Sequence, residues 1–373
     1  MYSEFLDVQK RSPFFSVCLH SRSVVVIPLF FMPILLRTAL LCCFILLTAC
    51  TGKPKPEPAW LFHQGNALGT SYSIKYEHPE GTDLSEEIVA LLDAFENSMS
   101  IYRPQSVISQ INANVPGVKP DAHFVKMYGV ARGIWEETGG LYDITVAPLV
   151  NAWGFGPANR ADVPAEQIDS LLKFVGMDKV SLQEGVVVKS DSRIMFDCNS
   201  IAKGYAVDLV ASFLEHQNID NYLVEIGGEI NARGVNPSRK TWTVAIDKPF
   251  DGNQMPGVYR QAVLSLRDRS LATSGNYRRY FEDNGVKYAH SINPLTGFPV
   301  RDTLLSVTIV APDCTTADAW ATACMVSGMQ KSLSLLERHP ELDAYLVYSD
   351  REGKYHSFST KGIKENILAE AAE

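Results

Sequence analysis

The chain has 373 residues, of which 46% are hydrophobic and 20% are charged. This composition excludes a collagen-like chain, an intrinsically disordered chain and a polytopic membrane protein. The length allows one large domain or two intimate halves with a sizeable core. The net charge is −8, from 34 Lys and Arg against 42 Asp and Glu. This acidic balance, without a basic stripe, predicts no nucleic-acid partner.

The first fifty residues differ from the rest of the chain. Residues 24–49 are almost entirely apolar. We expect translation to start at Met32, after which a short basic segment, an apolar run and small residues precede Cys50 in turn. This order resembles a bacterial lipoprotein signal, in which residues 1–49 are removed and Cys50 becomes the lipidated first residue. An uncleaved signal anchor is the alternative, because the apolar run is long enough to span a bilayer.

The lipoprotein interpretation sets the expected domain boundaries. Residues 50–58 form the lipidated cysteine and a Pro-rich tether, and residues 59–373 form the folded domain. A lipid at Cys50 places the protein in the bacterial cell envelope, anchored to the inner or outer membrane and facing the periplasm. An odd number of cysteines, without a CxxC pair, remains in the domain, so no disulfide framework is predicted.

Hydrophobic patterns predict strands and helices in a mixed order. Tyr72, Ile74 and Tyr76 alternate with small or polar residues, which indicates an early half-buried strand. Asp83 and Glu86 are spaced as a capping box that opens a helix. Further strands are predicted at 222–226, 242–246, 262–266, 306–310 and 344–348, and further helices at about 124–138, 200–216 and 317–336. Strands and helices without a regular βαβ repeat favour an α+β fold.

The segment 195–208 carries the densest chemical signal. An apolar strand ends at Asp197, small residues turn, and a helix is expected to begin near Ser200. Such a turn presents free backbone N–H groups to an anion. Lys203 in the first turn adds a positive charge suited to phosphate. The alternative is that Ser200 caps a surface helix on which Lys203 is solvated.

A second signal is the pair Asp318 and Thr322, which are four residues apart. On a helix this spacing places both oxygens on one face. Because the surrounding residues are apolar, the carboxylate must be paired or must hold a cation. Hard oxygen ligands suit Mg²⁺, which usually takes one or two carboxylates together with substrate phosphates. The alternative is that Asp318 is a helix N-cap following Thr316.

Two more features suggest a ligand site. His290 stands just before a tight turn at 293–297, where it is a candidate general base, although a lone histidine is more often structural. The segments 98–103 and 139–156 place aromatic side chains beside glycines and charges. Such surfaces suit a fused-ring ligand, and core packing explains them equally well.

Taken together and in this order, the segments resemble the ApbE-type FAD:protein FMN transferases, over essentially the whole mature chain. The matching blocks are LGTSY (68–72), SIYR (100–103), YDITVAPL with WGFG (142–149, 153–156), DCNSIAKGYAVD (197–208), EIGGE (225–229), ATSG (272–275), HSINPLTG (290–297) and ADAWAT (317–322).

The resemblance implies a specific activity and fold. These enzymes bind FAD and Mg²⁺ and transfer FMN to a threonine hydroxyl of an acceptor protein, with release of AMP. Acceptors in the family are flavin-bearing subunits of membrane redox complexes, such as sodium-pumping quinone reductases. The implied fold is α+β and related to the T-fold, with two intimate mixed subdomains and a flavin cleft between them.

The resemblance also assigns roles by motif position. The FAD site would be lined by Leu68, Tyr102, Leu141, Tyr142, Asp143, Asp197, Lys203 and Ile292. The Mg²⁺ ion would be held by Asp318 and Thr322, with Ser200 contributing at the start of its helix. Since the attacking hydroxyl must lose its proton, His290 is the candidate base, and an aspartate near the metal is its rival.

The sequence departs from the common family pattern at a few positions. Cys198 and Asn199 fill a turn that usually holds small residues, and Asn276, Asn293 and Glu229 stand where aspartates are common. The two lost charges predict weaker handling of metal or substrate. An Mg²⁺-dependent FAD pyrophosphatase, which releases free FMN and AMP, would have nearly the same sequence. A non-catalytic FAD-binding lipoprotein is the third possibility, which the spacing of the oxygen ligands disfavours.

Overall fold

The computed structural model describes residues 57–156, 164–250, 253, 255, 257–276, 280–283 and 286–371. The predicted signal region and Cys50 lie outside these residues, so both stay predictions. In the described part of the chain, no helix is both long enough and apolar enough to cross a membrane. Residues 56–373 form one compact unit.

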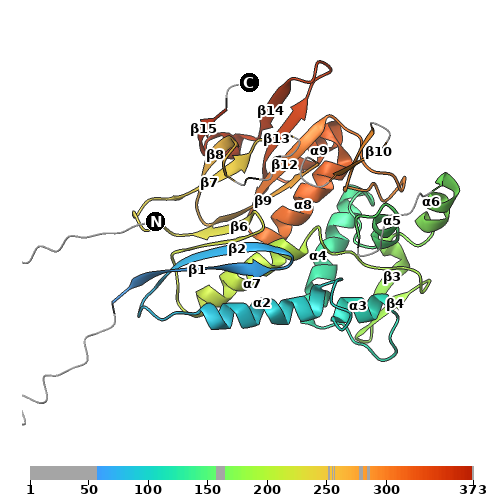
Figure 1. Cartoon of the computed structure of the whole chain (residues 1–373), viewed down its shortest axis with the longest axis horizontal. Helices are drawn as coiled ribbons and strands as arrows, with labels where there is room; N and C mark the ends of the chain where they lie inside the picture. Colours follow the sequence, from blue (N-terminus) through green and yellow to red (C-terminus); the bar gives the residue numbers. More distant parts are fainter. Residues whose placement is uncertain are drawn as a thin grey trace, which may run out of the picture. The chain divides into compact units, whose positions relative to one another are not determined.

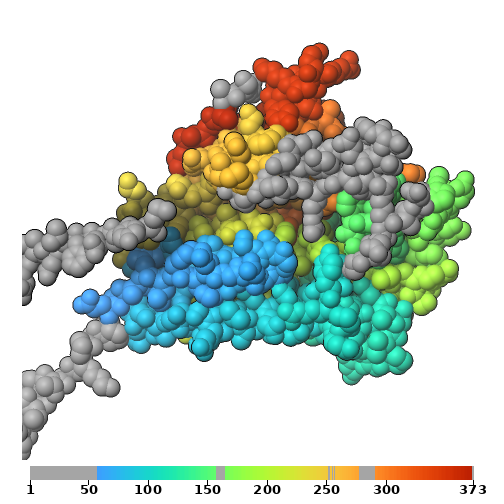
Figure 2. All heavy atoms as spheres, in the orientation of Figure 1, coloured from blue at the N-terminus to red at the C-terminus, as the bar shows by residue number. Residues whose placement is uncertain are grey.

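An eight-stranded sheet, in which every neighbouring pair of strands is antiparallel, runs through this unit (Figure 1). Its strands, in spatial order, are β1 (Ala59–Ala67), β2 (Thr70–His78), β5 (Tyr222–Ile226), β6 (Glu229–Arg233), β9 (Arg269–Gly275), β12 (Leu304–Ala311), β13 (Asp343–Ser349) and β14 (Tyr355–Ser359). The β1–β2 hairpin forms the edge of the sheet and lies at the surface beside α2 (Ser85–Met99) (Figure 2).

The central strands are buried on both faces because alternate side chains enter two different cores. On β12, Val307 and Ile309 pack with the helices α7 (Ala202–His216) and α8 (Cys314–Ser327). Val310 points to the opposite face, where a smaller sheet packs. The smaller sheet consists of β7 (Trp242–Asp247), β8 (Arg260–Leu266) and β15 (Ile367–Glu370). The large sheet therefore separates a helical layer from a second sheet.

Shorter elements surround these layers. They are α3 (Val107–Asn112), α4 (Ala122–Thr138), α5 (Ala147–Ala152), α6 (Ala165–Leu172), α9 (Met329–Leu336), α10 (Lys361–Lys364), a 3₁₀ turn at Met177–Lys179, and the hairpins β3 (Val180–Gln183) with β4 (Val186–Lys189) and β10 (Tyr280–Asp283) with β11 (Val286–Ala289). A small third core around α5 and α6 contains Leu149, Ile168, Val175 and Ile292.

The mixed α+β class is confirmed, and so are all six predicted strands, each within two residues. The helices predicted at 124–138 and 200–216 correspond to α4 and α7. The single helix predicted at 317–336 is wrong. Gly328 has φ +75°, a left-handed conformation that ends α8 and separates it from α9. The predicted flavin cleft between two subdomains stays a prediction.

The predicted capping box of α2 is also wrong. The helix begins at Ser85, and its N-cap residue Leu84 makes no side-chain cap bond. Asp83 instead accepts a hydrogen bond from the Ser85 N–H at 3.0 Å. Asp83 therefore lies one residue before the N-cap position and binds the first N–H group of the helix.

Candidate functional site

The start of α7 packs directly against α8, and a glycine makes this contact possible. A Cβ atom on Gly204 would lie 2.2 Å from the Cys314 carbonyl oxygen and 2.7 Å from the Asp318 Cβ. Only glycine fits this space. The Gly204 N–H donates a hydrogen bond to Asp318 Oδ2 at 2.9 Å. The close packing thus places a free N–H of the helix start against a buried carboxylate.

A second carboxylate joins the same two helices. Asp208 on α7 accepts hydrogen bonds from the backbone N–H groups of Cys314 and Thr315, both at 2.8 Å. The N-cap of α8 is Asp313, which accepts from the Thr316 N–H at 2.8 Å. The alternative in which Asp318 is the N-cap is therefore wrong.

Lys203, Glu229 and Asp318 form a buried charged cluster. Lys203 Nζ lies 2.7 Å from Glu229 Oε1 and 4.0 Å from Asp318 Oδ1. Both carboxylate residues are 3% exposed. Although 29% of its side chain is exposed, Lys203 is ion-paired, so the alternative of a solvated lysine is wrong. The second Glu229 oxygen, Oε2, is buried and has no hydrogen-bond partner in the part of the chain that the structure describes.

Burial and mutual charge shift the pKa values in the charged cluster. Burial raises the pKa of Glu229 from 4.5 to about 7, with Lys203 opposing the rise and Asp318 adding to it. Burial alone would lower the pKa of Lys203, but the two carboxylates raise it above its usual value. The ammonium therefore stays charged at neutral pH. Ionisation of the buried Glu229 carboxylate remains energetically unfavourable unless a further positive charge is bound beside it.

We expect the raised pKa of Glu229 to make the free energy of unfolding depend on pH. Between pH 4.5 and 7 the folded protein keeps a proton on Glu229 that the unfolded chain has lost. The contribution of this group to the free energy of unfolding therefore falls as pH rises through this window. In metal-free buffer, the wild-type protein should lose stability relative to Glu229→Gln between pH 5 and 7, as measured by urea unfolding.

Glu77 provides a control of opposite sign for this measurement. A hydrogen bond from Arg239 lowers its pKa, so its contribution to stability is constant above pH 5. The stability difference between wild type and Glu77→Gln should accordingly not change between pH 5 and 7. A constant difference for Glu229→Gln as well would contradict the assigned shift.

Ser200, in the turn before α7, is hydrogen-bonded to a second predicted residue, Tyr142. The Ser200 hydroxyl donates a hydrogen bond to the Tyr142 hydroxyl oxygen at 3.1 Å. Burial raises the pKa of Tyr142, and the charge of Asp318 adds to the rise, so the phenol lies within electrostatic reach of the charged cluster. The alternative interpretation, in which Ser200 caps α7, is wrong because the N-cap is Ile201.

Sequence reasoning missed Asn112, which fixes the approach to this turn. Its side chain donates to the Phe196 carbonyl at 2.9 Å and accepts from the Phe196 N–H at 2.7 Å. The next residue, the buried Asp197, accepts from the Asn199 N–H at 2.9 Å. These contacts hold the chain that leads into Ser200. Nothing local marks Asn112 in the sequence, because its partner is 84 positions away.

The candidate metal ligands are hard oxygen atoms. Asp318 and Thr322 lie on the same helix, and Thr322 Oγ1 is 3.0 Å from Ser274 Oγ of β9. Within the described ranges, no group of three or more His, Cys, Asp or Glu side chains could hold a metal ion. One buried carboxylate with hydroxyl oxygens leaves coordination positions for water and phosphate. This donor set fits Mg²⁺ better than a metal that needs a closed cage.

A shared carboxylate joins the segments that contain two other predicted residues, Leu68 and Tyr102. Glu96 on α2 accepts hydrogen bonds from the Leu68 N–H and from the Arg103 guanidinium. Leu68 has a left-handed backbone with φ +51° at the tip of the β1–β2 hairpin. Tyr102 precedes Arg103 and is 55% exposed. The structure thus brings the Leu68 and Tyr102 segments together, with a tyrosine ring open to a ligand.

Asp143 and its neighbours are held mainly by local contacts. Asp143 accepts from the Thr145 N–H at 2.7 Å, from the Thr145 hydroxyl at 2.6 Å and from the Met177 N–H at 3.1 Å. Burial raises its pKa. Leu141 and Ile292 are buried apolar residues. No hydrogen bond or ion pair between described residues joins Asp143 to the charged cluster, so its place in a FAD site stays a prediction.

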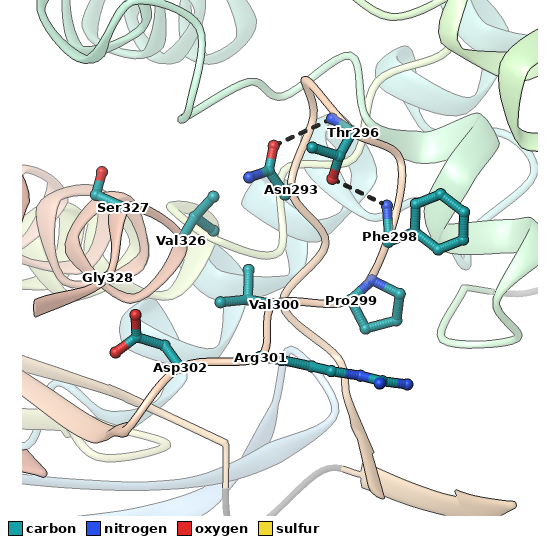
Figure 3. Close-up of a pocket in the computed structure, with 10 residues that line it drawn as sticks. All are labelled: Asn293, Thr296, Phe298, Pro299, Val300, Arg301, Asp302, Val326, Ser327 and Gly328. Carbon is teal, nitrogen blue, oxygen red and sulfur yellow. Dashed lines mark hydrogen bonds between the residues drawn. The ribbon is translucent and has the colours of Figure 1, made fainter. Parts of the chain in front are cut away.

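His290 lies on a segment that also lines a cavity. Its half-buried ring packs against Phe155, with ring centroids 6.4 Å apart. Further along this segment, residues 293–302 and the end of α8 enclose a cavity of about 280 Å³, shown in Figure 3. In that view the Asp302 carboxylate and the Ser327 hydroxyl lie toward the same end of the cavity. No member of the charged cluster lines it.

Comparison with known proteins gives a consistent result. The family model described as "ApbE family" matches residues 68–346. The FAD:protein FMN transferase of Haemophilus influenzae is 38% identical over 303 residues, which cover 78% of this chain and 86% of that protein. The FAD:protein FMN transferase of Vibrio cholerae is 35% identical over 314 residues, covering 82% and 92% respectively.

A solved structure shows the same fold. The structure described as flavin transferase ApbE from Vibrio cholerae matches with a TM-score of 0.75 and 32% sequence identity, over 83% of this chain and 99% of that one. The residues matched by the family model include Lys203, Glu229 and Asp318 of the charged cluster. The resemblance stated from the sequence is confirmed, and the chain belongs to the ApbE family.

Proposed function

We propose that this protein is an FAD:protein FMN transferase that uses Mg²⁺ to move FMN from FAD onto a threonine hydroxyl of an acceptor protein, releasing AMP. The observation that carries the proposal is the buried charged cluster, where an ammonium and oxygen ligands converge at the start of α7. The relatives named FAD:protein FMN transferase support it over most of the chain.

Two members of the charged cluster and their neighbours have separate tasks in this reaction. Asp318, Thr322 and Ser200 would hold Mg²⁺, and Lys203 would bind a pyrophosphate oxygen of FAD. Bound Mg²⁺ supplies positive charge that offsets the negative charge of the pyrophosphate. Tyr142, through its bond to Ser200, orients that hydroxyl. The remaining FAD contacts would come from Leu68, Tyr102, Leu141, Asp143, Asp197 and Ile292.

The transfer exchanges one P–O bond for another. The threonine oxygen attacks the phosphorus atom next to riboflavin, and the bond from that phosphorus to the bridging oxygen breaks, so that AMP leaves with the bridging oxygen. The hydroxyl proton passes to a base, for which His290 is our candidate, held beside Phe155 on the segment that continues to Ile292. An aspartate near the metal is the rival.

The first fifty residues indicate where in the cell the protein acts. We propose that Cys50 carries the lipid anchor and that the domain faces the periplasm of the cell envelope. The apolar run followed by small residues and a cysteine supports this. An acceptor in that compartment would be a flavin-bearing subunit of a membrane redox complex.

The test follows the fates of both halves of FAD. The mature protein is mixed with FAD, Mg²⁺ and an acceptor domain that has a surface threonine, and the acceptor's intact mass and free AMP are measured together. An acceptor heavier by one phosphate-linked FMN, with equal AMP, supports the transferase. AMP and free FMN with an unmodified acceptor would identify a pyrophosphatase, and no AMP would leave a flavin binder. Chelation of Mg²⁺ should stop AMP release.

A further inference from the structure

We propose that Glu229 is a positioning residue that makes FAD binding depend on a divalent cation, by neutralising the ammonium of Lys203 when the cation is absent. The inference rests on the proposed function, because it concerns the pyrophosphate of FAD. It assigns a role to a residue that belongs neither to the predicted metal ligands nor to the predicted FAD contacts.

The β5–β6 hairpin holds Lys203 at both ends. Gly227 and Gly228 form a two-residue turn with φ +66° and φ +102°, the left-handed conformations of a tight hairpin. A Cβ on Gly227 would lie 3.1 Å from Lys203 Cδ, so the turn packs on the lysine stem. Glu229 follows the turn and contacts the ammonium at 2.7 Å. The turn therefore fixes the glutamate and the lysine relative to each other.

Within the charged cluster, the Lys203 ammonium is hydrogen-bonded to Glu229 and not to Asp318. Asp318 Oδ1 lies 4.0 Å from Lys203 Nζ, which is too far for a hydrogen bond. Asp318 uses its other oxygen for the Gly204 N–H. Glu229 makes its one described polar side-chain contact with Lys203, since its Oε2 has no hydrogen-bond partner among the described residues. The glutamate charge thus acts chiefly on the lysine.

A charge count shows the consequence. With both carboxylates ionised, Lys203, Glu229 and Asp318 carry one positive and two negative charges, so the cluster is negative overall. A pyrophosphate carries two further negative charges and is repelled from such a site. Without the Glu229 charge the cluster would be neutral, so the glutamate is what makes it negative overall. A divalent cation reverses the sign of the site and lets the pyrophosphate bind.

The experiment measures the dissociation constant of FAD by quenching of flavin fluorescence, without acceptor, at pH 8, in EDTA and in Mg²⁺. Glu229→Gln keeps the size and the hydrogen bond to Lys203 but removes the charge. In EDTA it should bind FAD roughly tenfold more tightly than the wild type, as expected for one partly screened charge near the phosphates. The ratio of the dissociation constants in EDTA and in Mg²⁺ should fall accordingly.

Three variants separate this role from a merely structural one. Glu229→Asp keeps the charge and should leave the ratio within about twofold of wild type. Glu229→Met removes the charge with an apolar side chain of similar length and should shift the ratio as Glu229→Gln does. Glu225→Gln is the matched control, because Glu225 lies on the same hairpin and accepts from the Gly228 N–H at 2.7 Å without contacting Lys203. Its ratio should equal that of the wild type.

Two results would overturn the inference. Unchanged or weaker FAD binding in EDTA for both Glu229→Gln and Glu229→Met would show that the glutamate charge does not oppose the pyrophosphate. That result, together with normal AMP release by the wild type, would leave the proposed function intact. A wild-type protein that neither binds FAD nor releases AMP would overturn the proposed function and this inference together.

Discussion

Replacing Asp318 with Asn should lower the rate of FMN transfer and of AMP release by about a thousandfold or more. The amide oxygen of Asn can still accept the hydrogen bond from the Gly204 N–H, so the contact between α7 and α8 is kept. What the variant loses is the negative charge that would hold the metal beside the pyrophosphate. Transfer is measured by the intact mass of the acceptor, and AMP is measured in the same samples.

Asp313→Asn is the matched control for this variant. Asp313 lies on the same helix end and caps α8 by accepting from the Thr316 N–H. Since Asn is as good an N-cap as Asp, this variant removes one negative charge near α8 and keeps the cap bond from the Thr316 N–H. The second bond, which the Thr316 hydroxyl donates to Asp313 Oδ2, is lost or reversed. It should keep near wild-type transfer. If Asp318→Asn retained more than a tenth of the wild-type rate, the metal role of Asp318 would be wrong.

Gly204→Ala should lower the free energy of unfolding by about 3 kcal/mol or more, which ranks with severe core overpacking. The added methyl group would meet the Cys314 carbonyl oxygen at 2.2 Å, and a backbone atom cannot turn aside as a flexible side chain can. The helices must therefore separate at this point, which also breaks the bond from the Gly204 N–H to Asp318. Urea unfolding at neutral pH measures the loss.

Gly129→Ala tests whether the effect comes from the contact or from the substitution itself. Gly129 lies in the interior of α4, and a Cβ there has no atom within 4 Å. Alanine is the better helix former, so this variant should gain about 0.5–1 kcal/mol of stability. Opposite signs for the two substitutions are expected. A loss for Gly204→Ala no larger than about 1 kcal/mol would show that the two helices adapt more easily than the packing indicates.

The sequence was most informative where local patterns decide the structure. The strand at 222–226 was predicted at its observed ends. Its sequence is a short run rich in apolar residues, and a Gly-Gly turn follows it. Strand β9 was not predicted, because Ser270, Ala272 and Ser274 give no apolar alternation, although the strand lies in the middle of the sheet. Its place there depends on its neighbours in space.

Helix ends also differ in whether local sequence or tertiary packing determines them. The break between α8 and α9 was missed because a glycine is tolerated inside many helices, and only its left-handed φ, set by tertiary packing, ends α8 at Gly328. The N-cap of α8 was available from the sequence, since Asp313 stands three residues before Thr316 and follows a proline.

The sequence predicted one phosphate and metal site from the turn before α7 and the helix that carries Asp318. It did not connect Lys203 with Glu229. That contact depends on a hairpin turn that packs against α7, and residues 26 positions apart carry no mark of it. Glu229 itself was noted only as a departure from the family pattern. Its burial and unpartnered oxygen come from the structure.

The cap that Asp208 provides to α8 has a consequence for the order of folding. Asp208 and its partner Cys314 are separated by 106 positions, and Gly204 and Asp318 by 114. Contacts of such long range form late, after the intervening chain has closed its loop. A nascent chain that ends before α8 has no charged cluster, however completely α7 has formed. The charged cluster is therefore completed only when the segment that begins with α8, about the last sixth of the chain, docks against α7.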